Sequence, residues 1–175
     1  GNWEGTIFEL TSDKIEKSKA GSDLVSGILQ TGFPWHEPQK SFTSITSSQQ
    51  WWENVKPKFI EVFVALGYNE SEASEKADLV PQQYTKPDKW ELYSDTLPCL
   101  GLLQNTDWRS VLVTNNIPEF PSIVKHLGLE NYFEAVFVSS LTGYNKPNPL
   151  ILNAFLKTIL KNTKMVVVGD REDSD

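Results

Sequence analysis

The stretch RSVLVTNN, from Arg109 to Asn116, predicts a buried β-strand that ends in a polar turn. Its apolar centre is short and rich in valine, which favours a strand over a helix. Two further stretches, FEAVFVSS (133–140) and KMVVVGD (164–170), repeat this pattern. Helical spacing separates the three, from Phe120 to Leu127 and from Pro149 to Leu160. Strands that alternate with helices predict an α/β fold with a parallel sheet covered by helices on both faces.

The preceding part of the chain, from Thr11 to about Pro87, predicts about four helices and no convincing strand. Ser47 and Gln50 form a capping-box pattern, which predicts the start of a helix with a broad apolar face. Pro57 lies inside this run and predicts a bend or an interruption. Asn69, followed by acidic residues, predicts the start of the next helix.

The composition is that of an ordinary globular protein, with 39% hydrophobic and 22% charged residues among 175. The formal net charge is -7, from 23 acidic and 16 basic residues. An acidic surface argues against nucleic acid or an anionic membrane as the main partner. A small anionic substrate is still compatible, because a local cation can reverse the sign inside a cleft. No stretch approaches the roughly 18 apolar residues of a membrane span, and no signal peptide is visible.

The single cysteine, Cys99, excludes an internal disulfide. It lies in a short apolar helix predicted from Leu97 to Leu103, where we expect it to be a buried packing residue. We therefore expect a reducing, cytoplasmic location. The first residue is Gly1 and not methionine, which predicts a processed or trimmed chain.

Polar side chains follow the predicted strands, at the edge where parallel sheets bind ligands. Thr114 and Asn115 follow the first strand, Lys146 lies in TGYNKPNP after the second, and Asp170 and Asp175 follow the third. Each has an ordinary alternative: a helix N-cap for Thr114, a solvated lysine for Lys146 and a turn residue for Asp170. Together they supply a hydroxyl and an ammonium group for a phosphoryl group and two carboxylates for a magnesium ion.

The order of NWEGT, VLVTN, KPNP and VVVGDREDSD resembles the four motifs of the haloacid dehalogenase (HAD) superfamily. Its members are mostly phosphatases with a Rossmann-like core. The resemblance spans nearly the whole chain, and SSQQWW, KPDKWELYSD and TGYNKPNPLIL are similar to subfamily I, in the branch of the haloacid dehalogenase-like hydrolase domain-containing protein 3 type. It implies a Rossmann-like core, incomplete at both ends, from residues 1–10 and 88–175, with an inserted all-helical C1 cap from 11 to 87.

The resemblance also implies catalytic roles. Asn2 occupies the position of the nucleophile and Glu4 that of the general acid and base. Thr114 and the backbone of Asn115 would bind the substrate phosphate, and Lys146 would steady both the nucleophile and the phosphate. The implied partner is a small phosphorylated molecule.

The implied cofactor is Mg²⁺, positioned by Asp170 and Asp175 and held also by the Asn2 side chain and the Glu4 carbonyl. Glu4 replaces the usual aspartate but keeps a carboxyl group able to transfer a proton. Asn2 has no anionic oxygen, so no aspartyl-phosphate could form on it. Three explanations stay open: a substitution in an active enzyme, a natural loss that leaves a binding protein, or a misplaced motif.

The first functional hypothesis is a Mg²⁺-dependent phosphatase of a small phosphomonoester, inactive in this chain if Asn2 is the nucleophile. The alternative is a non-catalytic relative that binds a phosphorylated ligand or a protein partner. A third hypothesis, carbon–halogen hydrolysis, needs no metal and leaves the paired carboxylates unused.

The loop GFPWHEP (32–38) lies where relatives often carry specificity residues, so Trp35 and His36 are candidates for substrate contact. The alternative is that Trp35 packs in the cap and His36 is solvated. Trp51 and Trp52 are adjacent, and at least one should be in the core.

Overall fold

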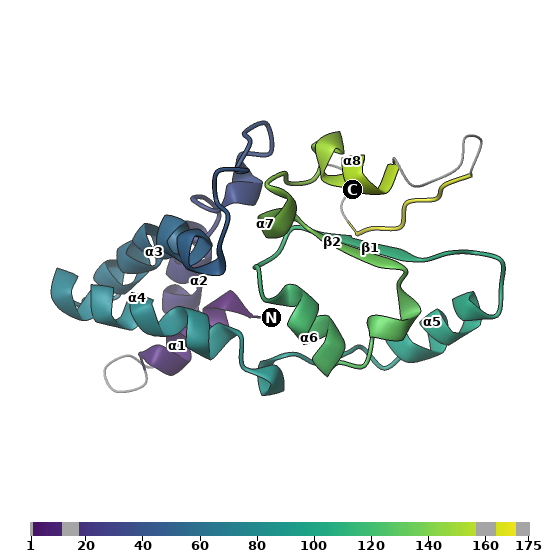
Figure 1. The fold of residues 1–175 in the computed structure, drawn as a ribbon. Helices are drawn as coiled ribbons and strands as arrows, with labels where there is room; N and C mark the ends of the chain where they lie inside the picture. Colours follow the sequence, from purple (N-terminus) through teal and green to yellow (C-terminus); the bar gives the residue numbers. More distant parts are fainter. Residues whose placement is uncertain (1, 12–17, 157–163, 171–175) are drawn as a thin grey trace.

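The computed structural model describes residues 2–11, 18–156 and 164–170. A helical part, made of α1 to α4, is followed by an α/β part that holds a small sheet and the helices α5 to α8 (Figure 1). Among the described helices, none has the length and apolar character that crossing a bilayer requires.

The helical part is built on the pairing of α3 with α4, against which α2 and α1 pack. Its elements are α1 (Trp3–Leu10), α2 (Lys19–Ile28), the 3-10 turn η1 (Pro34–His36), α3 (Ser48–Ala65) and α4 (Glu70–Tyr84).

The longest helix, α3, begins where the sequence predicts. The Ser47 side chain accepts a hydrogen bond of 3.2 Å from the Gln50 amide. The predicted bend or interruption at Pro57 is wrong, because α3 continues through it to Ala65. Val55 and Phe59, one on each side of the proline, are buried in one core and hold both halves of the helix in register.

The next helix, α4, also begins as predicted. The Asn69 side chain accepts from the Glu72 amide at 3.0 Å, and the Glu72 carboxylate accepts from the Asn69 amide at 3.1 Å. This reciprocal pair is a capping box. Gly67, with φ of +93°, makes the turn between α3 and α4.

In the structure the NWEGT residues form the start of α1. Asn2 is the N-cap, and its side-chain oxygen accepts from the Gly5 amide at 2.8 Å. Ile7 and Phe8 are buried against the rest of the helical part, with α4 and α2 as the neighbouring helices. An asparagine followed by an acid suits a helix start as well as it suits a catalytic motif, and the buried apolar face stabilises the helix.

Aromatic side chains fill the centre of the helical part. Trp3 stacks on Tyr84 with ring centroids 3.6 Å apart, which ties α1 to the end of α4. Burial raises the pKa of the Tyr84 hydroxyl well above its usual range. Trp51 and Trp52 are both buried, so the expectation that at least one lies in the core is confirmed.

The α/β part contains a parallel sheet, as predicted. Strand β1 (Val111–Thr114) pairs with β2 (Ala135–Val138), and Thr114 lies opposite Val138. The other elements are η2 (Pro87–Lys89), α5 (Thr96–Gln104), α6 (Phe120–His126), η3 (Glu130–Tyr132), α7 (Ser139–Thr142), η4 (Pro149–Leu152) and α8 (Asn153–Leu156).

Both strands are shorter than predicted, because Ser139 already begins α7 and Asn115 begins the loop after β1. The predicted strand 164–170 is wrong: this segment is extended, is assigned to no strand and is exposed, with Val168 at 92%. A run of valines becomes a strand only when its backbone pairs with another strand, and β1 and β2 pair only with each other in the described part. The predicted helix from Pro149 is present as η4 and α8, while residues 157–160 lie outside the described ranges.

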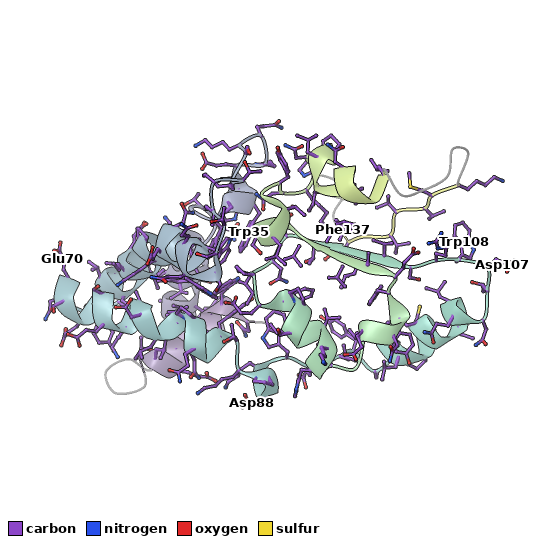
Figure 2. All side chains as sticks on the ribbon, in the orientation of Figure 1. Trp35, Glu70, Asp88, Asp107, Trp108 and Phe137 are labelled. Carbon is purple, nitrogen blue, oxygen red and sulfur yellow. The ribbon has the colours of Figure 1, made fainter. Side chains whose placement is uncertain are left out.

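Helix α6 matches the prediction: it ends at His126, and Gly128, whose φ is +70°, follows its C-cap Leu127. Helix α5 is also present, but Cys99 is exposed, so the expectation of a buried cysteine is wrong. No residue of α5 is buried, because α5 contacts mainly η3 at the edge of the α/β part. Figure 2 shows Asp107 and Trp108, which follow α5, at the end of the molecule opposite Glu70.

Candidate functional site

The candidate site is the carboxyl edge of the sheet. Because β1 and β2 are parallel and in register, the loops that follow Thr114 and Val138 emerge at the same edge. The first loop leads to α6, and the second runs through α7 to η4 (Figure 1). This edge is where open parallel sheets bind ligands.

Two predicted site residues meet at this edge. The Lys146 amide donates to the Asn115 side-chain oxygen at 2.7 Å, and the Asn115 side-chain nitrogen donates to the Lys146 carbonyl at 3.1 Å. Asn115 therefore fixes the backbone of Lys146 beside the end of β1. Thr114 is the chain neighbour of Asn115 and the last residue of β1. The structure thus brings the three predicted phosphate-binding residues to one edge.

Sequence reasoning missed two further polar residues here. Ser139 is buried, and its hydroxyl accepts from the Asn116 amide at 3.2 Å, which joins the two loops. Asn145 is 1% exposed, and its side-chain oxygen has no hydrogen-bond partner. A buried amide oxygen without a partner is costly, and such groups concentrate at functional sites. Asn145 stands next to Lys146 in the quoted motif, so its position was the available signal.

Asn2 and Glu4 stand at the start of the chain, before the two strands. Both belong to the start of α1 in the helical part, where the Glu4 carboxylate accepts from the Ser26 hydroxyl at 3.2 Å. They line a separate, open depression of about 530 Å³ between α1 and α2. The three explanations offered above for Asn2 therefore all stay open, and its catalytic role stays a prediction.

The predicted Mg²⁺ ligands lie only partly in the described part of the chain. Asn2 and Glu4 lie in α1, Asp170 is exposed, and Asp175 is outside the described ranges. Within those ranges, no three histidine, cysteine, aspartate or glutamate side chains come together as a metal site. Because Asp175 lies outside the described ranges, the predicted Mg²⁺ ligand set stays a prediction.

The helical part docks on the same edge through the segment between η1 and α3. The Phe42 amide donates to the Gly143 carbonyl at 2.8 Å, and the Asn148 side chain donates to the Pro38 carbonyl at 3.0 Å. Gly143 and Asn148 both belong to the loop of the α/β part that carries Lys146. The candidate site and the contact between the two parts therefore share one loop.

Glu119, in the loop between β1 and α6, makes a second contact between the two parts. One of its carboxylate oxygens accepts hydrogen bonds from the Ser48 hydroxyl and, at 3.1 Å, from the Trp52 indole. Its other oxygen is buried and has no hydrogen-bond partner. Both donors lie in the first turns of α3, so Glu119 holds the start of that helix over the edge of the sheet.

Trp35 stacks on Phe33, with centroids 4.5 Å apart, and lies 5.9 Å from Trp51. Figure 2 shows it on the side of the helical part that faces the α/β part. His36 is exposed, and its ring nitrogen accepts from the Phe33 amide at 3.3 Å. The packing alternative for Trp35 is confirmed, and substrate contact by either residue stays a prediction.

The family model of the haloacid dehalogenase-like hydrolases matches residues 5–175. The chain therefore belongs to the haloacid dehalogenase-like hydrolase family. The match begins at Gly5, after Asn2 and Glu4.

Three curated relatives are similar over part of the chain. Glyceraldehyde 3-phosphate phosphatase of Methanopyrus kandleri is 32% identical over 95 residues, which cover 53% of this chain and 38% of that protein. Human haloacid dehalogenase-like hydrolase domain-containing protein 3 is 24% identical over 63% of this chain and 43% of its own length. The mouse protein of the same name is 25% identical over the same shares. The matched regions thus span less than half of each relative.

A solved structure with a similar fold is that of YfnB from Bacillus subtilis, described as a HAD hydrolase bound to magnesium and showing interdomain movement. The TM-score is 0.63 at 19% identity, over 92% of this chain and 68% of that chain. At this identity the likeness supports the α/β fold.

Proposed function

We propose that the protein carrying this chain is a phosphatase that acts on small phosphomonoesters. Family membership and the relative that is a glyceraldehyde 3-phosphate phosphatase support this reaction class. The observation that carries the proposal is the pair of hydrogen bonds between Asn115 and the Lys146 backbone, because it fixes a cationic residue beside the end of β1.

In this proposal the substrate phosphate binds at the edge formed by Thr114, Asn115 and Lys146. The Thr114 hydroxyl and the Asn115 backbone amide donate to phosphoryl oxygens, and the Lys146 ammonium group offsets their charge. A local cation is needed because the chain as a whole has a net charge of -7 and repels an anion at long range.

The helical part takes the place of the C1 cap. Its docking on Gly143 and Glu119 supports a role in covering the edge of the sheet, and such a cover excludes bulk water from a phosphoryl-transfer site. Magnesium dependence is part of the proposal, because the similar YfnB structure holds magnesium. Part of its predicted ligand set lies outside the described residues, so no step of the chemistry is attributed to the ion.

The test is phosphate release from a panel of sugar, polyol and aromatic phosphates, with and without Mg²⁺. We expect turnover with Mg²⁺, and a loss of at least about 100-fold in kcat/KM for Lys146→Met, as for a charged group that stabilises the transition state. Lys125→Met, at an exposed position of α6, is the matched control and should keep full activity.

Two outcomes would contradict the proposal. Phosphate binding without turnover of any substrate would favour the non-catalytic alternative. Turnover that is equal in Lys146→Met and in the unmodified protein would remove Lys146 from the site.

A further inference from the structure

The turn that carries Lys146 is closed by its own backbone. The Asn148 amide donates to the Asn145 carbonyl at 2.8 Å, so Lys146 and Pro147 are the two central residues of a four-residue turn. Asn115 holds this turn at the end of β1 through its two hydrogen bonds to the Lys146 backbone. Because a turn closed in this way moves as a unit, a contact that holds its last residue also affects Lys146.

The last residue of the turn, Asn148, is held by its side chain. The side-chain oxygen accepts from the Leu150 amide at 3.0 Å, which caps the start of η4. The side-chain nitrogen donates to the Pro38 carbonyl at 3.0 Å, in the segment between η1 and α3 of the helical part. The side chain is half-buried, and an amide suits its position because it can accept and donate at once. Asn148 therefore joins the turn to two other segments.

The hydrogen bond to Pro38 is separable from the cap. Capping the start of a helix needs only an acceptor oxygen, which aspartate or serine also supplies. Donation to the Pro38 carbonyl needs the amide nitrogen and the length of an asparagine side chain. Together with the bond between the Phe42 amide and the Gly143 carbonyl, it places contacts from the helical part before and after Lys146 in the chain.

We propose that Asn148 is a positioning residue for Lys146. Its hydrogen bond to Pro38 keeps the turn in the arrangement in which Lys146 serves the phosphate site. Asn148 acts through Lys146 and does not itself need to touch the substrate. This inference rests on the proposed phosphatase function.

The first experiment replaces Asn148 by serine and, separately, by aspartate. Both keep an oxygen that can cap η4; serine is too short to reach Pro38, and aspartate has no N–H group to donate. For the most active substrate of the panel, we expect kcat to fall about 5- to 10-fold in Asn148→Ser and at least as much in Asn148→Asp. KM should change by less than about 2-fold, because a displaced cation stabilises the transition state less well. A loss in the neutral serine variant excludes the charge of aspartate as its cause.

Asn105→Ser is the matched control, because the Asn105 side-chain nitrogen also donates to a backbone carbonyl, that of Gly101 in α5. This variant should keep both kcat and KM. An unchanged kcat in Asn148→Ser, or a change confined to KM, would overturn the inference and leave the phosphatase proposal intact.

The second experiment needs no substrate and separates the two proposals. Hydrogen exchange at the Lys146 amide is followed by NMR in the unmodified protein, in Asn148→Ser and in Asn105→Ser. We expect exchange at least about 5-fold faster in Asn148→Ser alone, because the bond from this amide to Asn115 opens more often once the turn is released from Pro38. That result would support the positioning role even if no phosphatase activity were found. An unchanged rate in Asn148→Ser would overturn it.

Discussion

Gly143 and Thr43 approach so closely that a Cβ atom added to Gly143 would lie 2.7 Å from both the amide nitrogen and the Cα of Thr43. Gly143 also has φ of +75°, and its carbonyl accepts from the Phe42 amide. This position therefore requires glycine for two reasons: its backbone has a positive φ, and Thr43 leaves no space for a Cβ atom. The helical part meets the α/β part at a point where no side chain fits.

Gly143→Ala should destabilise the protein by more than the backbone strain alone. Gly128→Ala is the matched control, because Gly128 has a similar φ of +70° but open space where its Cβ would be. The strain at Gly128 is expected to cost about 1–2 kcal/mol. Gly143→Ala should cost roughly 1–3 kcal/mol more, as overpacked sites do, measured by urea unfolding. Equal losses would show that the two parts separate freely.

Glu119→Ala should also weaken the docking, because it leaves the Trp52 indole and the Ser48 hydroxyl without their acceptor. We expect a loss of about 1.5–3 kcal/mol in the free energy of unfolding, as for hydrogen bonds to a charged group. Glu53→Gln, which alters an exposed hydrogen bond from Gln49 on the same helix, should change it by less than about 0.5 kcal/mol. Combining Glu119→Ala with Ser48→Ala should give less than the sum of the two losses, since both remove one contact.

Asn115→Ala should loosen the loop that carries Lys146. It removes both hydrogen bonds between the side chain and the Lys146 backbone, and leaves a partly buried amide unpaired. The expected loss is about 1–3 kcal/mol, together with faster hydrogen exchange at the Lys146 amide. Asn105→Ala, which removes an exposed hydrogen bond to Gly101, should not change that exchange rate. Unaltered exchange in Asn115→Ala would contradict the proposed role of Asn115 as the residue that positions Lys146.

Asn2 offers a test of the helix cap against the catalytic motif. As an N-cap, it should tolerate Asp or Ser, whereas Asn2→Ala should cost about 0.5–2 kcal/mol. Asn2→Asp should place a favourable negative charge at the start of α1 and create no phosphatase activity. Activity that appears only with Asp at this position would return NWEGT to the role of nucleophile motif.

Glu9 and Lys89 form an ion pair between α1 and η2 that makes the stability depend on pH. The hydrogen bond from Lys89, and then that from Gln83, lowers the pKa of Glu9, and Glu9 in turn raises the pKa of Lys89. A carboxyl group whose pKa is lowered by folding stabilises the fold at pH values above its unfolded-state pKa. This stabilisation is lost as the pH falls through the folded-state pKa. A lysine whose pKa is raised by folding stabilises the fold at pH values below its unfolded-state pKa. This stabilisation is lost as the pH rises through the folded-state pKa.

The unmodified protein should therefore be slightly more stable than Glu9→Gln near pH 7, and the difference should disappear as the solution is acidified below the usual range of glutamate. The effect should be small, because both side chains are partly exposed to solvent. Unfolding curves of both proteins at several pH values provide the measurement, with Glu91→Gln at an exposed position as the control. A difference that grows in acid would contradict the assignment of the pair.

The sequence was most informative where local chemistry alone determines structure. Ser47 and Asn69 predicted the starts of α3 and α4, and the valine-rich stretch at 111–114 predicted β1. The sequence was ambiguous where one pattern serves two purposes. Asn2 satisfies a helix N-cap and also resembles the first motif, and the valines before Asp170 resemble a strand although they lack a pairing partner in the described part.

Part of the site could be predicted and part could not. The ends of parallel strands must share an edge, so Thr114, Asn115 and Lys146 could be placed together from their order alone. The role of Glu119 depends on how the helical part sits on the sheet, and nothing in its local sequence indicates this contact.

The ring contacts that begin with Trp3 on Tyr84 continue through Trp90 to Phe120, with successive centroids 5.4 and 5.8 Å apart. They cross from one part of the molecule to the other. Because indole emission responds to its surroundings, separation of the two parts would alter the fluorescence of Trp90 while that of Trp108, half exposed at the far end, would stay constant. The intrinsic tryptophan fluorescence of the protein would therefore report separation of the helical part from the α/β part without an attached dye.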